Sequence, residues 1–512
     1  MPTLKTQGKR RLALIHSATI LGLDAVAVEI EVDLSAGLPT LQIVGLPDQS
    51  IRESRERIRA AILNSQLAFP SARITINLAP ADLKKEGPAF DLPMAIGLLT
   101  ACGYVNPERA GQFRFLGELA LDGSLRAVTG AMSTALMTSQ APLPLVLPRA
   151  NAPEAALANH ATAYGFNSLS EVIGFLNNEQ VIAPTQSAQL VFQEPRYGCD
   201  FSEVKGQYHA KRAIEIAVAG YHNLLMIGPP GAGKTMLARR IPTVFPPLER
   251  QEWIDLIRIN DLVQPLSFDE KIKKGRPFRH PHHTISQAGL TGGGSLPKPG
   301  EVTLAHHGVL FLDELPEFQR SALEVLRGPL EDKSVTISRA KQALTFPSNF
   351  MLVCAMNPCR CGYYGDLYHT CRCRMEDVQR YLSKLSGPLL DRIDLHLEIP
   401  KVTLQDLRDT RPAESSAVMR QRIIQARDRQ QSRQSLLNAH LSVKALRDVC
   451  KLTPPAEKLL HQIVQELHMS ARAYHKILKI SRTIADLNQV EHINEEAVSE
   501  ALHYRSLDRL LQ

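Results

Sequence analysis

The sequence lacks the features that would place it in a membrane or outside the cell. No run of about 18 apolar residues occurs, which excludes an ordinary membrane-spanning helix. The N-terminal segment has only a short apolar stretch and no small-residue cleavage site, so we expect no signal peptide. Cysteine is sparse at eight residues, and half of them are scattered, unlike a secreted disulfide framework. These absences predict a cytoplasmic protein with reduced thiols and no membrane partner.

Internal repeats and low-complexity tracts are also missing, which excludes a repeat architecture. The net charge of +7 is compatible with a nucleic-acid partner. Because the basic residues are spread along the chain, charge alone favours an ordinary solvated surface.

The 512 residues are too many for one ordinary domain, and the pattern divides them into three regions and a linker. Residues 1–180 alternate short β patterns with helices. Residues 181–198 contain two prolines and no clear period, which is typical of a linker. Residues 199–400 alternate helix and strand with Gly-rich loops, as in an α/β fold with a parallel sheet. Residues 401–512 contain no glycine, and we expect them to be helical throughout.

Hydrophobic periodicity predicts individual elements. Residues 25–32 and 73–78 have the pattern of strands. Residues 48–64 predict a helix with a dense charged face, and residues 115–126 predict a hairpin that turns at Asp122-Gly123. The predicted helix 414–436 carries five arginines that do not form one stripe, so we expect a solvated face rather than a DNA-binding one; they are Arg420, Arg422, Arg427, Arg429 and Arg433.

The strongest local motif is a phosphate-binding loop, the P-loop, at residues 228–235. Its residues fit the pattern GxxxxGK[ST] and are Gly228, Pro229, Pro230, Gly231, Ala232, Gly233, Lys234 and Thr235. A buried strand, Leu224–Ile227, precedes the loop and a helix follows it, which is the context that the motif requires. We expect Lys234 to contact the β and γ phosphates of ATP and the Thr235 hydroxyl to bind Mg²⁺.

A second strand ends in two acidic residues, in the sequence GVLFLDE at residues 308–314. Asp313 is placed to hold Mg²⁺, directly or through water, and Glu314 to polarise the attacking water. A third strand, Met351–Met356, leads to Asn357, whose polar side chain would orient that water near the γ-phosphate.

Two arginines complete the predicted catalytic set. Arg392, in GPLLDRID, would act as an arginine finger on the ATP of a neighbouring subunit, which requires an oligomer. Arg472, in the last region, would sense the γ-phosphate. For each of them taken alone, a surface salt bridge is the competing interpretation.

These motifs, in this order, resemble the magnesium-chelatase-like clade of AAA+ ATPases. Within that clade, residues 37–62 and 74–99 closely resemble the ComM/YifB family, and the resemblance covers essentially the whole chain. It implies an AAA+ core, a C-terminal helical lid, and contacts of Val204 and Gln207 with the adenine side of ATP. It also implies a homo-hexameric helicase that binds single-stranded, double-stranded and branched DNA. Such a helicase drives branch migration in homologous recombination during natural transformation, where recombination proteins are potential partners.

The first region also resembles the proteolytic domain of Lon. Ala89 stands where Lon proteases carry the nucleophilic serine, and Met132 stands at the lysine position. A Ser/Lys dyad is therefore missing, and we expect a Lon-like α/β domain without peptidase activity.

Two segments of the ATPase region are candidates for DNA contact. Residues 276–300 are rich in Arg and His around a glycine run and include Arg279 and Lys298. Residues 334–347 predict a hairpin with Arg339 and Lys341 at its tip, where contacts to phosphate would be independent of sequence. Packing is the alternative for the hairpin. Three nearby histidines could be structural or could bind a ligand: His280, His282 and His283.

Four cysteines fall within fifteen residues just after Asn357: Cys359, Cys361, Cys371 and Cys373. Four thiolates could hold a structural Zn²⁺ tetrahedrally, with His369 as a substitute ligand. Free thiols are the main alternative, because the CxC spacing is less common than CxxC.

Three other functions compete with the DNA motor. The ATPase subunit of a magnesium chelatase shares the core, but it lacks a Lon-like extension. A protease would need the missing dyad. A sigma-54-type transcription activator would carry a GAFTGA loop, whereas the corresponding residues here read AGLTGGG.

Overall fold

The computed structural model describes residues 11–137, 143–158, 161–186, 197–263, 268–273, 275–294, 297–339, 342–366, 368–403, 406, 413–466 and 468–505. The chain divides into two compact units. Unit 1 comprises Met1–Gln193 and Arg250–Lys273, and unit 2 comprises Glu194–Glu249 and Lys274–Gln512. Among the helices of these described residues, none is both long and apolar enough to cross a membrane.

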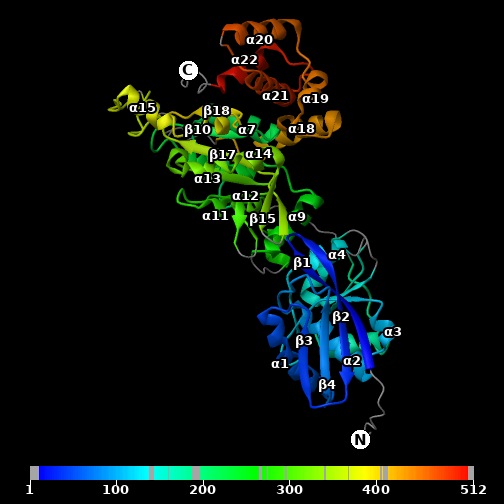
Figure 1. Ribbon diagram of the computed structural model, residues 1–512. Helices are drawn as coiled ribbons and strands as arrows, with labels where there is room; N and C mark the ends of the chain where they lie inside the picture. Colours follow the sequence, from blue (N-terminus) through cyan, green and yellow to red (C-terminus); the bar gives the residue numbers. More distant parts are fainter. Residues whose placement is uncertain are drawn as a thin grey trace. The chain divides into compact units, whose positions relative to one another are not determined.

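Unit 1 is built on a mixed seven-stranded sheet in the order β3-β4-β2-β1-β5-β8-β9 (Figure 1). Its long antiparallel part comprises β1 (Arg11–Leu21), β2 (Asp24–Ser35) and β4 (Arg73–Ala79), with β3 (Thr40–Val44) parallel to β4. The other strands are parallel: β5 (Arg114–Phe115), β8 (Leu145–Pro148) and β9 (Ala163–Phe166). Both strands predicted in this region are present, although β2 is longer than expected.

Two helices cover the core of unit 1. Helix α1 (Gln49–Asn64) begins after Asp48, whose carboxylate accepts the Ile51 N–H as an N-cap. Helix α2 (Asp91–Cys102) is almost entirely apolar and buried, and it ends at Gly103 in the left-handed conformation. The predicted hairpin is present as β6 (Glu118–Leu119) paired with β7 (Leu125–Arg126). The remaining short helices are η1 (Pro88–Phe90), α3 (Pro107–Ala110), α4 (Ala131–Met137), η2 (Arg149–Asn151), α5 (Ala152–Ala155) and α6 (Leu169–Leu176).

A segment from the middle of the expected ATPase region folds with unit 1. Helix α9 (Arg250–Asp261) buries Ile254 and Ile257 in one apolar cluster with α4 and β8. Helix α10 (Phe268–Lys273) follows it. This arrangement differs from the expected domain bounds, which assigned residues 199–400 to one core.

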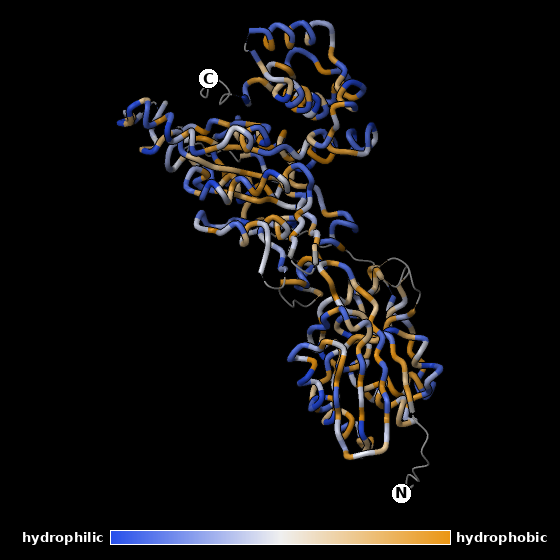
Figure 2. The backbone as a smooth tube through the Cα atoms, viewed as in Figure 1, coloured by the Kyte–Doolittle hydropathy of each residue, from blue (hydrophilic) through white to orange (hydrophobic). Residues whose placement is uncertain are grey.

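Unit 2 contains a five-stranded, all-parallel sheet in the order β11-β14-β17-β10-β18. Its strands are β10 (Leu224–Ile227), β11 (Phe278–Arg279), β14 (Val309–Leu312), β17 (Met351–Met356) and β18 (Leu395–Glu398). Every residue of β10, β14 and β17 is buried, which agrees with their continuous apolar sequences. The tube in Figure 2 shows these central strands as hydrophobic segments among hydrophilic helices.

The sheet of unit 2 is flanked by α7 (Tyr208–Gly220) and α8 (Lys234–Val244). Smaller elements precede or follow β14: η3 (Phe201–Glu203), α11 (Gln287–Thr291), β12 (Gly292–Gly293), β13 (Lys298–Pro299), α12 (Glu301–Leu304), η4 (Leu315–Glu317), α13 (Arg320–Glu324) and α14 (Arg327–Asp332). The hairpin predicted at residues 334–347 is formed by β15 (Ser334–Arg339) and β16 (Gln342–Pro347). Two helices lie between β17 and β18: α15 (Met375–Leu382) and α16 (Gly387–Leu390).

The elements described in the C-terminal part of unit 2 are helices joined by short non-helical segments. It comprises α18 (Ser416–Gln434), η5 (Asn438–His440), α19 (Val443–Val449), α20 (Pro454–Glu466), α21 (Ala471–Leu487) and α22 (Glu495–His503). Apolar residues of α18, α21 and α22 share one core cluster with α7 and the sheet. Figure 1 shows α19 to α22 gathered at one end of this unit.

The arginines of α18 do not form the solvated face that we expected. Arg433 pairs with the buried Asp486 at 2.7 Å, and Arg427 donates to the Val218 carbonyl at 2.6 Å. Arg422 forms ion pairs with Glu215 and Glu414. The prediction was wrong for these three arginines because acceptors on α7 and α21, far away in sequence, bind them; Glu414 is the exception, eight residues from Arg422.

Candidate functional site

The P-loop connects the carboxyl end of β10 to the first turn of α8, as the motif predicted. Gly231 and Gly233 have φ of +78° and +89°, a conformation that strains other residues. A Cβ added at Gly228 would lie 2.3 Å from the Ile399 carbonyl oxygen, so this position also requires glycine. The loop thus turns the N-terminus of α8 toward the position of a bound phosphate.

The Lys234 side chain lies inside this loop. Its Nζ donates to the carbonyl oxygens of Gly228 and Pro229 at 2.6 and 3.0 Å, and to Asn357 Oδ1 at 3.1 Å. The residue is 9% exposed, and burial lowers the pKa of its ammonium group. Lys234 therefore joins the P-loop to the strand-end residue Asn357.

The two acidic residues lie at the carboxyl end of β14, which is two strands away from β10. Asp313 Oδ2 accepts a hydrogen bond of 2.7 Å from the Thr235 hydroxyl. Glu314 has φ of +53°, and its Oε2 lies 3.6 Å from Nδ1 of His283. The hydroxyl and carboxylate are the oxygen ligands that Mg²⁺ prefers.

Asn357 follows β17, which lies between β10 and β14 in the sheet. Its backbone N–H donates to the Tyr381 hydroxyl from α15. Three strand ends thus bring Lys234, Asp313 and Asn357 to one edge of a parallel sheet. This edge is where α/β sheets bind their ligands.

Of the two predicted adenine-side residues, Gln207 contacts the same loop. Val204 is fully buried in the core of unit 2. Gln207 has φ of +53°, and its Nε2 donates to the carbonyl oxygens of Pro400 at 2.9 Å and Ala232 at 3.4 Å.

The two predicted arginines make contacts within the chain. Arg392 pairs with Glu331 and donates to the Pro388 carbonyl at 2.6 Å. Arg472 begins the first turn of α21, where its Nη1 lies 3.3 Å from Asp391 Oδ2. Because Asp391 and Arg392 are adjacent, Arg472 lies close to the short segment after α16 that carries Arg392.

The candidate DNA contacts fall into two groups. Arg279 forms a two-bond ion pair with Glu301 at 2.6 and 2.7 Å, whereas Lys298 is exposed on β13. The side chain of Arg339 and the whole of Lys341 lie outside the described residues. The three histidines do not form a metal-ligating group among the described residues.

The four clustered cysteines come together as their spacing suggested. Their sulfur atoms all lie within 4.8 Å of one another. His369 is exposed and its Nδ1 lies 3.1 Å from Lys401 Nζ, so it is not a member of this group.

In unit 1, the Lon-like positions form no catalytic pair. Ala89 lies in η1, and Met132 is buried in an apolar cluster. The neighbouring Asp91 is fully buried and pairs with Arg57 at 2.6 Å, which stabilises the start of α2 instead.

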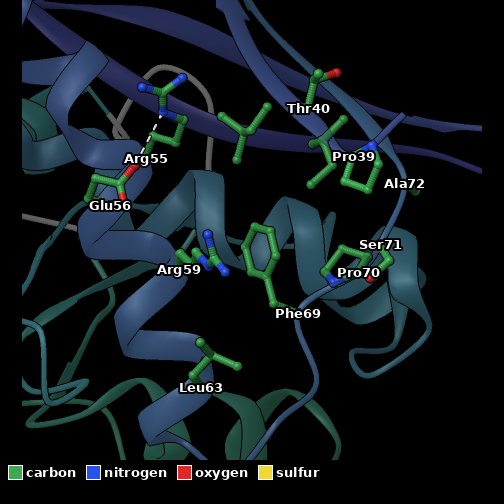
Figure 3. A pocket seen from close by; sticks show the side chains of 12 residues that line it. Pro39, Thr40, Arg55, Glu56, Arg59, Leu63, Phe69, Pro70, Ser71 and Ala72 are labelled. Carbon is green, nitrogen blue, oxygen red and sulfur yellow. Dashed lines mark ion pairs between the residues drawn. The ribbon is translucent and has the colours of Figure 1, made fainter. Parts of the chain in front are cut away.

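A cavity of about 640 Å³ lies between α1, the start of β3 and residues 69–72, which lead into β4 (Figure 3). Arg55, Arg59 and Phe69 line it, with the Arg59 guanidinium 5.9 Å from the Phe69 ring centre. None of the sequence-predicted site residues lines this cavity.

Sequence reasoning missed Tyr381, which belongs to no motif and comes near the site only through the folded arrangement of α15. His283 was already a candidate, but its approach to Glu314 depends on the folded loop after β11.

Comparison with known families covers most of the chain, in three segments. Residues 200–407 match the family described as "Magnesium chelatase, subunit ChlI". Residues 30–151 match "Subunit ChlI of Mg-chelatase", and residues 413–505 match "Magnesium chelatase, subunit ChlI C-terminal".

Comparison with individual proteins extends over nearly the full length. The chain is 43% identical to Competence protein ComM of Haemophilus influenzae, over 98% of this chain and 99% of that protein. It is also 43% identical to the uncharacterized protein YifB of Escherichia coli, over 98% of both chains. A 146-residue segment is 30% identical to Lon protease 2 of Bacillus subtilis, over 27% of this chain and 26% of that protein.

Proposed function

The chain belongs to the family of Competence protein ComM and YifB, and from this premise we propose that it is an ATP-dependent DNA helicase. As a hexamer in the cytoplasm, it would drive branch migration in homologous recombination during natural transformation. The observation that carries the proposal is the meeting of Lys234, Thr235, Asp313 and Asn357 at the ends of three parallel strands. The name of the Haemophilus relative, Competence protein ComM, supports the link to competence.

The contacts of the site support ATP binding with Mg²⁺. Lys234 holds carbonyl oxygens with its ammonium group, and β and γ phosphate oxygens would replace them. Thr235 and Asp313 would hold Mg²⁺, and Glu314 would polarise the attacking water. Asn357, already bound to Lys234, would orient that water.

Arg392 and Arg472 connect hydrolysis to assembly in this proposal. Arg392 would leave Glu331 and bind a phosphate of the ATP in a neighbouring subunit. Arg472 would sense the γ-phosphate. An arginine finger raises the rate of nucleotide hydrolysis about 10³–10⁵-fold. An Arg392→Ala variant should therefore hydrolyse ATP very slowly as a hexamer, and turnover at the wild-type rate would refute the role of the finger.

DNA contact is proposed at Arg279, Lys298, Arg339 and Lys341. Contacts to phosphate make binding weaker as salt rises. The test is ATP turnover of the full chain without DNA and with single-stranded, duplex or four-way DNA, at several salt concentrations. Salt-sensitive stimulation supports a DNA motor. Unchanged turnover, together with no DNA binding at low salt, would contradict it.

Matched variants separate a specific contact from general charge. Lys298→Ala should reduce the stimulation by DNA. Lys458→Ala removes an exposed lysine of α20 and should leave the stimulation unchanged. Equal effects of both variants would argue against a contact at Lys298.

A second candidate is an ATPase motor that remodels a protein partner for metal insertion. The matches to magnesium chelatase families favour it. It predicts ATP turnover that responds to a protein partner and not to DNA.

A further inference from the structure

Four cysteine side chains in unit 2 are arranged as the ligands of one metal ion. The cysteine cluster consists of Cys359, Cys361, Cys371 and Cys373, and three of its sulfur–sulfur distances are 3.3, 3.5 and 3.7 Å. A tetrahedral Zn²⁺ with four sulfur ligands at about 2.3 Å would place the sulfur atoms about 3.8 Å apart. The observed separations are close to this value and far beyond the length of about 2.05 Å for a disulfide bond.

Backbone N–H groups point at these sulfur atoms. Cys361 Sγ accepts hydrogen bonds from the N–H groups of Arg372 and Tyr363, and Cys373 Sγ accepts one from the N–H of Cys361. Each CxC pair thus supplies donors to the thiols of the other. Such donors stabilise negatively charged thiolates and orient them toward a metal.

The loop that carries the cluster packs against the P-loop. A Cβ added at Gly362 would lie 2.6 Å from Pro230 Cδ in the P-loop and 3.9 Å from Asn357 Cγ. Cys359 is only two positions after Asn357 and is fully buried. The cluster therefore lies directly beside the residue that contacts Lys234.

A second anchor holds the far side of the same loop. Lys401, which follows β18, pairs with Asp366 at 3.2 Å and lies 5.0 Å above the Tyr363 ring. Asp366 in turn accepts the N–H groups of Tyr368 and His369 at 2.7 and 3.2 Å. These contacts order the residues between the two CxC pairs and keep the pairs together.

We propose that the cysteine cluster binds one structural Zn²⁺, which holds this loop against the P-loop and so fixes Asn357 beside Lys234. Zinc suits the site because four thiolates form a closed ligand set with no open position for catalysis. Binding releases the remaining thiol protons and requires no oxidant or reductant. The inference does not depend on whether DNA is the substrate of the motor.

The first test is the zinc content of the full-length protein, purified without chelator and analysed by elemental mass spectrometry. The expected result is one zinc per chain, released when a mercurial reagent modifies the thiols. Replacement by Co²⁺ should give the absorption spectrum of tetrahedral thiolate coordination. Protein that carries no zinc, and gains no such spectrum with Co²⁺, would overturn the proposal.

Variants locate the metal. Cys371→Ser together with Cys373→Ser should abolish stoichiometric zinc, whereas Cys102→Ser, in unit 1, should retain it. If the double variant does not fold, the metal content and Co²⁺ spectrum of the wild-type protein still decide the question. Zinc retained in a folded double variant would refute the assignment of ligands.

A further variant tests the coupling to the ATP site. Gly362→Ala should keep zinc but lower the rate of ATP hydrolysis, since the added methyl group cannot fit against Pro230. The change should appear in kcat more than in nucleotide affinity, because Asn357 positions water. Wild-type kcat in this variant would show that the loop does not support Asn357.

Discussion

Replacing Lys234 by methionine separates the role of this residue in nucleotide chemistry from its role in folding. The ammonium group is almost completely buried and binds two carbonyl oxygens and Asn357, with no carboxylate of the described residues in direct contact. Methionine fills the volume of the lysine stem but cannot bind phosphate.

The size of the effect follows from the contacts that are lost. Two charge-assisted hydrogen bonds to phosphate, at about 1.5–3 kcal/mol each, amount to about 3–6 kcal/mol. Hydrolysis should therefore fall by roughly 10²–10⁴-fold. The free energy of unfolding should change by less than about 1.5 kcal/mol, because loss of the hydrogen bonds is offset by relief of the desolvation that lowers the lysine pKa.

The assay is steady-state ATP turnover, with urea denaturation of the same preparations. Lys479→Met is a matched control, because Lys479 is another lysine of unit 2 whose pKa burial lowers, and it donates to the Ala439 carbonyl. The control should retain its turnover. Near-wild-type turnover of the Lys234 variant would refute its role, and a large loss of stability would refute the estimate of its contribution to folding.

Three further predictions concern other residues. Glu314→Gln should bind ATP but hydrolyse it about 10²–10⁴-fold more slowly, as measured by nucleotide binding and single-turnover hydrolysis. Burial, and then the charge of a neighbouring arginine, keep the pKa of His396 well below its ordinary value. Below about pH 6.5 the unfolded chain binds a proton that the folded chain does not, so the free energy of unfolding falls by up to about 1.4 kcal/mol per pH unit; above about pH 6.5 it is unaffected. His396→Leu should reduce this slope in denaturation experiments at several pH values. Lys271 is buried between Glu154 and Asp261, so Lys271→Met should destabilise the protein by about 3–5 kcal/mol in urea, and amide replacement of both carboxylates should restore most of this loss.

The nucleotide site was the part of the structure that the sequence predicted best. Strands β10 and β17 have the expected bounds, because strands buried on both faces are continuous apolar runs. The P-loop glycines also act locally, so their spacing is sufficient to predict the turn.

Features that depend on distant partners were not predictable in the same way. The apolar face of α9 gives no sign that it packs on α4 and β8 of unit 1 rather than on the sheet of unit 2. The arginines of α18 form no stripe, and several of their partners lie on helices more than fifty residues away, such as Asp486 for Arg433. Patterns within one helix contain no information about such contacts.

The cysteine cluster lies between these two cases. Its spacing indicated a metal site without deciding between zinc and free thiols. The approach of the sulfur atoms to one another and the close contact of Gly362 with Pro230 appear only in the folded loop.

The most direct test of the proposed function is the ATP-dependent dissociation of a labelled four-way DNA junction by the purified protein, beside a Lys234→Ala control. The proposal predicts that the wild-type protein separates the junction only with ATP and that the control does not. ATP hydrolysis without movement of any junction, fork or flap would contradict a DNA motor and favour remodelling of a protein partner.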